Sequence, residues 1–211
     1  RQANTAWDGQ DVILTFEEVL VLAANASLRQ GRRIGVAPEL KHPTYFASLD
    51  LPMEDALVAI LTRHGLTGAD APVLVQCFEV GSLERLSARI DTPLLQLIAA
   101  GGGPIDTPGL SYAAMITPAS LAEIRRYAQW IGADAALIAS RPNAPAPLVA
   151  DAHSADLKVA VWTIRPENHF LPERFRQGAD PAQWGDQVGY VRALEASGVD
   201  AVFTDAPGAA R

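Results

Sequence analysis

The chain has 211 residues, of which 49% are hydrophobic and 19% charged, and its formal net charge is −7. This composition is typical of a globular protein, and at this length we expect one domain over residues 1–211. No apolar run reaches the roughly 18–20 residues that a membrane span needs, and no basic stripe indicates a nucleic-acid partner.

Helical and strand-like patterns alternate along the chain. Thr15 and Glu18 form a predicted capping box at the first helix, and Gly65 follows the second. Thr117 and Pro118 open a later helix that we expect to end at Gly132. The predicted helices cover 15–27, 51–65, 82–90, 118–132, 145–157 and 185–198, and the predicted strands cover 33–39, 72–78, 93–99, 135–139, 158–164 and 201–207.

Strands that are separated by helices must run parallel, because the chain has to cross back over the sheet each time. Two architectures fit this pattern: an open doubly wound sheet and a (β/α)8 barrel. The longer loops, at 43–50, 100–116 and 165–181, follow strands. Both architectures therefore predict that function lies at the carboxyl ends of the strands.

A carboxylate and an ammonium close the strand in "IGVAPELKHP". Side chains alternate between faces of a strand, so Glu39 and Lys41 point to one side and His42 points away. A spacing of about 6–7 Å along the strand suits a phosphate that also touches a divalent cation. The alternative is a surface ion pair at a strand end.

Six segments in sequence order carry a family resemblance: "TFEEVL", "IGVAPELKHPTYF", "VLVQCFE", "PLLQLI", "VWTIRPEN" and "GVDAVFTDAP". Together, from about Leu14 to Pro207, they resemble the glycerophosphodiester phosphodiesterase family, especially its bacterial periplasmic branch. The resemblance implies a TIM barrel, of which about six of the eight strands are expected in this chain. It also implies a hydrolase in which three acidic residues hold Ca²⁺ or Mg²⁺ and two histidines act as general acid and base. The implied products are sn-glycerol 3-phosphate and an alcohol.

The resemblance also assigns roles to individual residues. Glu39 matches a metal ligand, and Lys41 matches the lysine that offsets phosphate charge and steadies the transition state. Trp162 matches the apolar wall for the glycerol carbons, and Phe78 matches an aromatic at a strand end. Cys77 stands where the family usually has serine, and we expect a buried, unreactive thiol there.

Three motifs of the family are absent from the sequence: H-R-G, E-x-D and H-D. They supply both histidines and two metal ligands, so we expect an incomplete barrel that is inactive alone. The remaining alternatives are a non-catalytic phosphodiester-binding module, a piece that reassembles with a separate segment, and an unrelated doubly wound nucleotide-binding protein. We expect exposed barrel edges to favour homo-oligomers. By resemblance, we expect a periplasmic or secreted location.

Other side chains are weaker candidates. His169 and Asp205 follow strands on the expected functional face, where substrate contact competes with ordinary loop packing. His64 and His153 suit structural roles on helices. Trp130 and Trp184 are expected in the core, in helical surroundings.

Overall fold

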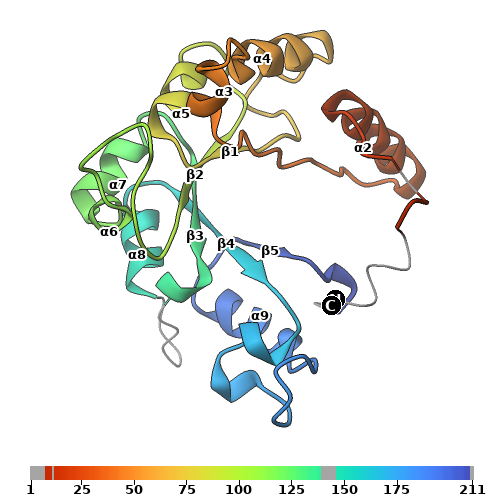
Figure 1. Ribbon diagram of the computed structural model, residues 1–211, viewed down its shortest axis with the longest axis vertical. Helices are drawn as coiled ribbons and strands as arrows, with labels where there is room; N and C mark the ends of the chain where they lie inside the picture. The colour runs from red at the N-terminus through yellow and green to blue at the C-terminus, as the bar shows by residue number, and fades with distance from the viewer. Residues whose placement is uncertain (1–7, 11, 139–145, 210–211) are drawn as a thin grey trace.

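The computed structural model describes residues 8–10, 12–138 and 146–209. Its centre is a sheet of five parallel strands, each paired with the next strand of the chain in the order β1-β2-β3-β4-β5. The sheet curves into an arc with helices on its outer side (Figure 1). This is the arrangement of part of a (β/α)8 barrel. A doubly wound sheet would reverse its strand order at a switch point, and the observed order has no reversal.

Helices and strands alternate along the described residues. The strands are β1 (Val75–Cys77), β2 (Leu94–Ile98), β3 (Trp130–Asp134), β4 (Lys158–Ile164) and β5 (Ala201–Thr204). The α-helices are α2 (Phe16–Gln30), α3 (Pro43–Ala47), α4 (Met53–Arg63), α5 (Val80–Ser87), α6 (Tyr112–Met115), α7 (Pro118–Ile124), α8 (Pro147–Ser154) and α9 (Gln187–Ala196). The 3₁₀ helices are η1 (Ala135–Leu137), η2 (Asn168–Phe170), η3 (Glu173–Phe175) and η4 (Pro207–Ala209). Within these residues, no helix is both long and apolar enough to cross a bilayer.

Several predicted helix ends are confirmed. The backbone N–H of Glu18 donates to the Thr15 hydroxyl over 3.3 Å, and the Thr15 N–H donates to the Glu18 carboxylate over 2.7 Å. Thr117 caps α7, with Pro118 as its first residue. Gly65, in the left-handed region with φ 65°, follows α4. Local chemistry thus fixes where these helices begin and end.

The strand predicted at 33–39 is not a continuous strand. The segment runs parallel to β1, but it forms only two isolated bridges, Val36 with Val73 and Glu39 with Gln76. Backbone bonds on either side of Pro38 join it to the neighbouring segment, including Val36 N–H to Pro72 O and Leu40 N–H to Gln76 O, both over 2.9 Å. Proline has no N–H to donate between them, so the ladder is interrupted there.

The prediction for residues 118–139 is wrong in its boundaries. Helix α7 ends at Ile124, and the fourth predicted strand lies earlier, as β3. Gly132 is therefore a strand residue and not a helix stop. A Cβ at this position would lie 2.5 Å from Leu95 Cδ2 and 2.9 Å from Leu97 Cδ2. The glycine is required because these two leucines of β2 pack against the backbone of β3. Residue 139 lies outside the described residues.

The two tryptophans placed in helices by the sequence are also corrected. Trp130 begins β3, is only partly buried, and has the Lys158 ammonium 5.2 Å from its ring centroid. Trp184 precedes α9 and is 56% exposed, so it is not a core residue. Its backbone instead makes an isolated bridge to Glu167.

The sheet buries apolar side chains on both faces. The larger cluster lies between the sheet and the helices and includes Val75, Ile131 and Val159, which are 0% exposed. On the inner face, Leu95, Leu97 and Ala160 form a smaller cluster. The half-buried side chains that pack against this inner cluster are Leu74, Phe78, Trp130, Trp162, Ala201 and Phe203.

A buried carboxylate links α4 to α5. Glu54, only 6% exposed, accepts hydrogen bonds from the Ser82 hydroxyl and the Arg85 guanidinium. Burial alone would raise the pKa of Glu54, but the bonds from Arg85, the Glu54 backbone and Ser82 outweigh it. The pKa therefore lies below the ordinary value of 4.5. The ionised form is favoured in the folded state.

This pKa shift predicts a loss of stability in acid. A carboxylate whose pKa is depressed by folding stabilises the fold above its unfolded pKa, and this contribution is lost as pH falls through the folded pKa. We expect Glu54→Gln to lower the free energy of unfolding by about 1–3 kcal/mol at neutral pH. The difference from the parent should shrink below pH 4.5. Urea unfolding at several pH values measures both effects. The exposed Glu84→Gln is the control, and a difference that persists in acid contradicts the explanation.

Candidate functional site

Glu39 and Lys41 lie together at the carboxyl end of the segment 34–40, which contains the two bridges to the β1 side. They point to one side, as strand alternation predicts, and form the ion pair that the sequence offers as the alternative. The Lys41 Nζ is 3.6 Å from the Glu39 Oε2, and the two side chains are 66% and 26% exposed. Glu39 is held beside Gln76 by its bridge to β1. The pair is therefore fixed at the expected end of the strands, with the ammonium more accessible to solvent than the carboxylate.

A cavity of about 300 Å³ lies against this pair. Its walls combine charged and aromatic side chains from the ends of several strands. They include Glu39, Lys41, His42, Phe78, Glu79 and Tyr112. His42 therefore lines the same cavity as Glu39 and Lys41, although strand alternation predicts that it points away, because its backbone is left-handed with φ 55°. Burial raises the pKa of Tyr112, with smaller effects from Cys77, Asp106 and Glu79, so its phenol remains protonated and can donate a hydrogen bond. The lining thus combines the Lys41 ammonium, which can attract an anionic group, with two carboxylates, those of Glu39 and Glu79.

Phe78 connects the cavity to Trp162. The two ring centroids lie 5.7 Å apart at an interplanar angle of 87°, and the Tyr112 ring centroid lies 6.0 Å from that of Phe78. The Trp162 indole N–H donates to Gly132 O over 2.8 Å, which fixes its ring against β3. The residues assigned by resemblance as substrate-binding are thus brought together across the mouth of the sheet.

Trp162 itself lines a second cavity, of about 660 Å³, at the ends of β3 and β4. Its polar residues include Asp134, Arg165, His169 and Arg176. The Arg165 guanidinium stacks over Phe170 at 4.8 Å and pairs with Asp205 over 2.9 Å. Asp205 therefore neutralises Arg165 at the ends of β4 and β5. His169 lies on the predicted face, beside Phe170 at 4.9 Å.

Cys77 and the remaining histidines are structural. The Cys77 thiol is 0% exposed, donates to Leu40 O over 3.1 Å, and has its pKa raised to about 12 by burial. His64 pairs with Glu17 and His153 with Asp200, both over 2.9 Å, and neither lines the cavities described above. The expectation of an unreactive cysteine and of structural roles for these histidines agrees with the geometry.

The described residues do not by themselves fit a divalent metal. Ca²⁺ and Mg²⁺ take about six or more oxygen ligands. Across residues 8–10, 12–138 and 146–209, no three His, Cys, Asp or Glu side chains come together in a way that could hold a metal ion. Glu39 is engaged with Lys41.

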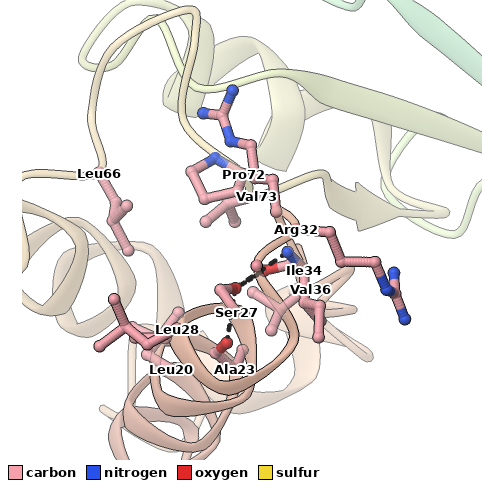
Figure 2. Close-up of a pocket in the computed structure, with 13 residues that line it drawn as sticks. Leu20, Ala23, Ser27, Leu28, Arg32, Ile34, Val36, Leu66, Pro72 and Val73 are labelled. Carbon is pink, nitrogen blue, oxygen red and sulfur yellow. Dashed lines mark hydrogen bonds between the residues drawn. The ribbon is translucent and has the colours of Figure 1, made fainter.

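A third cavity lies away from this chemistry. It measures about 570 Å³ and is formed by α2 and the segments that enter the sheet (Figure 2). The Ser27 hydroxyl donates to Ala23 O over 2.8 Å and accepts from the Ile34 N–H over 2.9 Å, which joins α2 to the start of the 34–40 segment. The lining is mainly apolar, with Leu20, Leu28 and Val73 pointing into it. This cavity lies at the amino ends of the strands, where the barrel architecture predicts stability and not function.

A family model for the glycerophosphoryl diester phosphodiesterase family matches residues 1–209. The chain belongs to this family. It is 31% identical over 218 residues to a glycerophosphodiester phosphodiesterase of Arabidopsis thaliana (GDPD6), covering 96% of this chain and 56% of the relative. It is 25% identical over 221 residues to a glycerophosphodiester phosphodiesterase of Haemophilus influenzae, covering 95% of this chain and 58% of the relative. The chain thus spans a little over half the length of these relatives.

Solved structures of candidate glycerophosphoryl diester phosphodiesterases share the fold. One from Silicibacter pomeroyi has a TM-score of 0.60 at 21% identity, covering 92% of this chain and 54% of that chain. One from Agrobacterium tumefaciens has a TM-score of 0.56 at 19% identity, covering 93% and 62%. The arc of parallel strands is therefore of the TIM-barrel type of this family, and the nucleotide-binding doubly wound alternative is wrong.

Sequence reasoning missed two residues of the site. Glu79 lies two residues after β1 and is only 2% exposed, and Tyr112 begins α6, which follows the loop after β2. A carboxylate at the end of an apolar strand, in "VLVQCFE", was a signal that could have identified Glu79. Nothing in the sequence distinguishes Tyr112 from the other residues between β2 and α7.

Proposed function

We propose that this chain carries the phosphate- and glycerol-binding part of a metal-dependent glycerophosphodiesterase. The reaction is hydrolysis of a glycerophosphodiester. Water adds to phosphorus, the bond from phosphorus to the alcohol oxygen breaks, and this oxygen takes up a proton. The products are the free alcohol and sn-glycerol 3-phosphate. The observation that supports this most is the Glu39–Lys41 pair, 3.6 Å apart, in a cavity that Phe78 joins to Trp162. Family membership supports the reaction class.

Each residue has a role that follows from its chemistry. The Lys41 ammonium attracts the anionic phosphate and offsets charge that develops on it. Phe78 and Trp162 offer apolar surface to the glycerol carbons. Glu39 would be one oxygen ligand of Ca²⁺ or Mg²⁺, and such an ion would polarise a phosphate oxygen. Because the described residues do not complete a metal site, we assign no step to the ion.

We propose that the chain is inactive alone. At the cavity beside Lys41, the part of the chain that the structure describes provides two carboxylates, Glu39 and Glu79, which are too few for a metal site, and no histidine pair. Those groups would come from the family's other motifs. A second candidate function follows from the same observation: binding of a phosphodiester without cleavage. We also propose, by resemblance, a periplasmic or secreted location and self-association through exposed sheet edges.

One assay separates these functions. The 211-residue chain is incubated with glycerophosphocholine and either Ca²⁺ or Mg²⁺, and release of sn-glycerol 3-phosphate is measured beside calorimetric binding of that product. We expect binding without release, and only weak uptake of either ion. Release by the chain alone would contradict its inactivity. Absence of binding would contradict the site itself, and light scattering on the same sample tests self-association.

A further inference from the structure

Glu79 is a carboxylate in an unusual environment. It follows β1, is only 2% exposed, and lines the same cavity as Lys41. One oxygen, Oε2, accepts from the Thr44 N–H over 3.0 Å and also from the Thr44 hydroxyl. The other oxygen, Oε1, is buried and finds no hydrogen-bond partner among the residues that the structure describes. Burying a carboxylate oxygen without a hydrogen-bond partner is unfavourable, so the presence of Glu79 at this position calls for an explanation.

The contact to Thr44 is a helix cap supplied from a distant part of the chain. Helix α3 begins immediately after His42, whose backbone is left-handed with φ 55° and whose side chain makes no cap. The first N–H groups of a helix lack partners within the helix. Glu79, 35 residues away in sequence, accepts the bond from one of them. The anionic oxygen at this helix end is also favoured by the helix dipole.

The residues on both sides of Lys41 are held by hydrogen bonds to other parts of the chain. On its amino side, Leu40 N–H donates to Gln76 O over 2.9 Å, and Leu40 O accepts from the Cys77 thiol over 3.1 Å. On its carboxyl side, Thr44 is held by Glu79. The sharp turn at His42 therefore cannot open without breaking a bond at one of the two ends. The direction of the Lys41 side chain depends on this turn.

We propose that Glu79 is the positioning residue for Lys41, an inference that rests on the proposed function for what Lys41 binds. Glu79 fixes the turn at His42 through Thr44, so that the ammonium stays at the cavity beside Phe78. Its role is to accept hydrogen bonds and not to bind a metal or transfer a proton. Because Oε1 accepts no hydrogen bond from the described residues, the amide of a glutamine fits there while its carbonyl oxygen keeps the bonds to Thr44.

The test compares Glu79→Ala with Glu79→Gln. Calorimetry with sn-glycerol 3-phosphate should show about a fivefold higher Kd for Glu79→Ala, the scale of a lost helix cap, and a Kd within about twofold of the parent for Glu79→Gln. In a Lys41→Met background, Glu79→Ala should add less than about twofold, because both changes act on one contact. Equal weakening by alanine and glutamine overturns the proposal, and so does a full alanine effect in the Lys41→Met background.

A second measurement needs no ligand. Hydrogen exchange of the peptide covering 39–47 should accelerate in Glu79→Ala and, more weakly, in Thr44→Val, but not in Glu79→Gln. Thr44 is exposed, so its substitution leaves the core intact. Unchanged exchange in Glu79→Ala overturns the proposal, whatever the binding result. The parent chain could fail to bind sn-glycerol 3-phosphate while exchange is faster in Glu79→Ala and unchanged in Glu79→Gln. In that case the proposed function fails, but the role of Glu79 in holding Thr44 stands.

Discussion

Lys41→Met is expected to raise the Kd of the chain for sn-glycerol 3-phosphate by about tenfold or more, equivalent to about 1.4 kcal/mol or more of binding free energy. Methionine keeps much of the length of the side chain and removes its charge. The effect should be large because Lys41 is the cation beside the cavity that Phe78 joins to Trp162. It should also diminish at high salt, since the ammonium is 66% exposed and its field is screened.

The chain offers a matched control for this experiment. Lys158 begins β4, at the opposite end of the strands, where its ammonium lies over the Trp130 ring. Lys158→Met removes the same charge from the molecule. We expect it to leave the Kd within about twofold of the parent, because charges separated by more than a Debye length of about 8–10 Å are largely screened. If Lys41→Met and Lys158→Met raise the Kd equally, only the net charge of the protein matters for binding. Lys41 would then have no specific role in the site.

Gly132→Val is expected to destabilise the fold by about 3 kcal/mol. A Cβ at this position would lie 2.5 Å from Leu95 Cδ2 and 2.9 Å from Leu97 Cδ2, inside contact distance. Both leucines belong to the inner cluster, so they have little room to move. For a domain of this size, the melting temperature should fall by about 6–12 °C.

Gly68→Val is the control for this prediction. Nothing lies within 4 Å of a Cβ built at Gly68, and the residue is exposed. We expect a change in the free energy of unfolding of less than about 0.5 kcal/mol, as for ordinary surface substitutions. A stable Gly132→Val variant with unchanged melting would contradict the position of β3 against β2.

The sequence predicts the class of fold well, because alternating helix and strand patterns with caps at Thr15 and Thr117 leave few topologies. It fails at residues 118–139, where "SLAEIRRYAQWIG" is compatible with a helix that continues to Gly132. There, the packing of Gly132 under Leu95 decides for a strand instead. The sequence also does not predict that Pro38 interrupts the backbone hydrogen bonds between its segment and β1. The interruption depends on which side of the segment faces β1, because only there is the missing N–H of proline needed.

The candidate site was predictable in part. The spacing of Glu39 and Lys41 predicts that their side chains lie on one side of the chain, and the two form an ion pair there, at the end of a segment that only bridges the sheet. The contact between Phe78 and Trp162 joins residues 84 positions apart, and it follows from the curvature of the sheet and not from any local pattern. Glu79 was missed for the same reason, since its partner Thr44 belongs to another element. Tertiary contacts of this kind are visible only once the sheet is assembled.

The central claim is that Lys41, Phe78 and Trp162 serve one ligand. Nuclear magnetic resonance of the tryptophan indole N–H groups tests it most directly, during titration with sn-glycerol 3-phosphate. Trp162→Phe identifies the Trp162 signal. Trp130 and Trp184 are internal controls, because Trp130 lies at the amino end of β3 and Trp184 is 56% exposed before α9, whereas Trp162 contacts Phe78 in the wall of the cavity beside Lys41. We predict that the Trp162 signal shifts and saturates in the parent, while Lys41→Met requires much more ligand. A Trp162 signal that stays fixed, or moves no more than those of Trp130 and Trp184, would contradict the account.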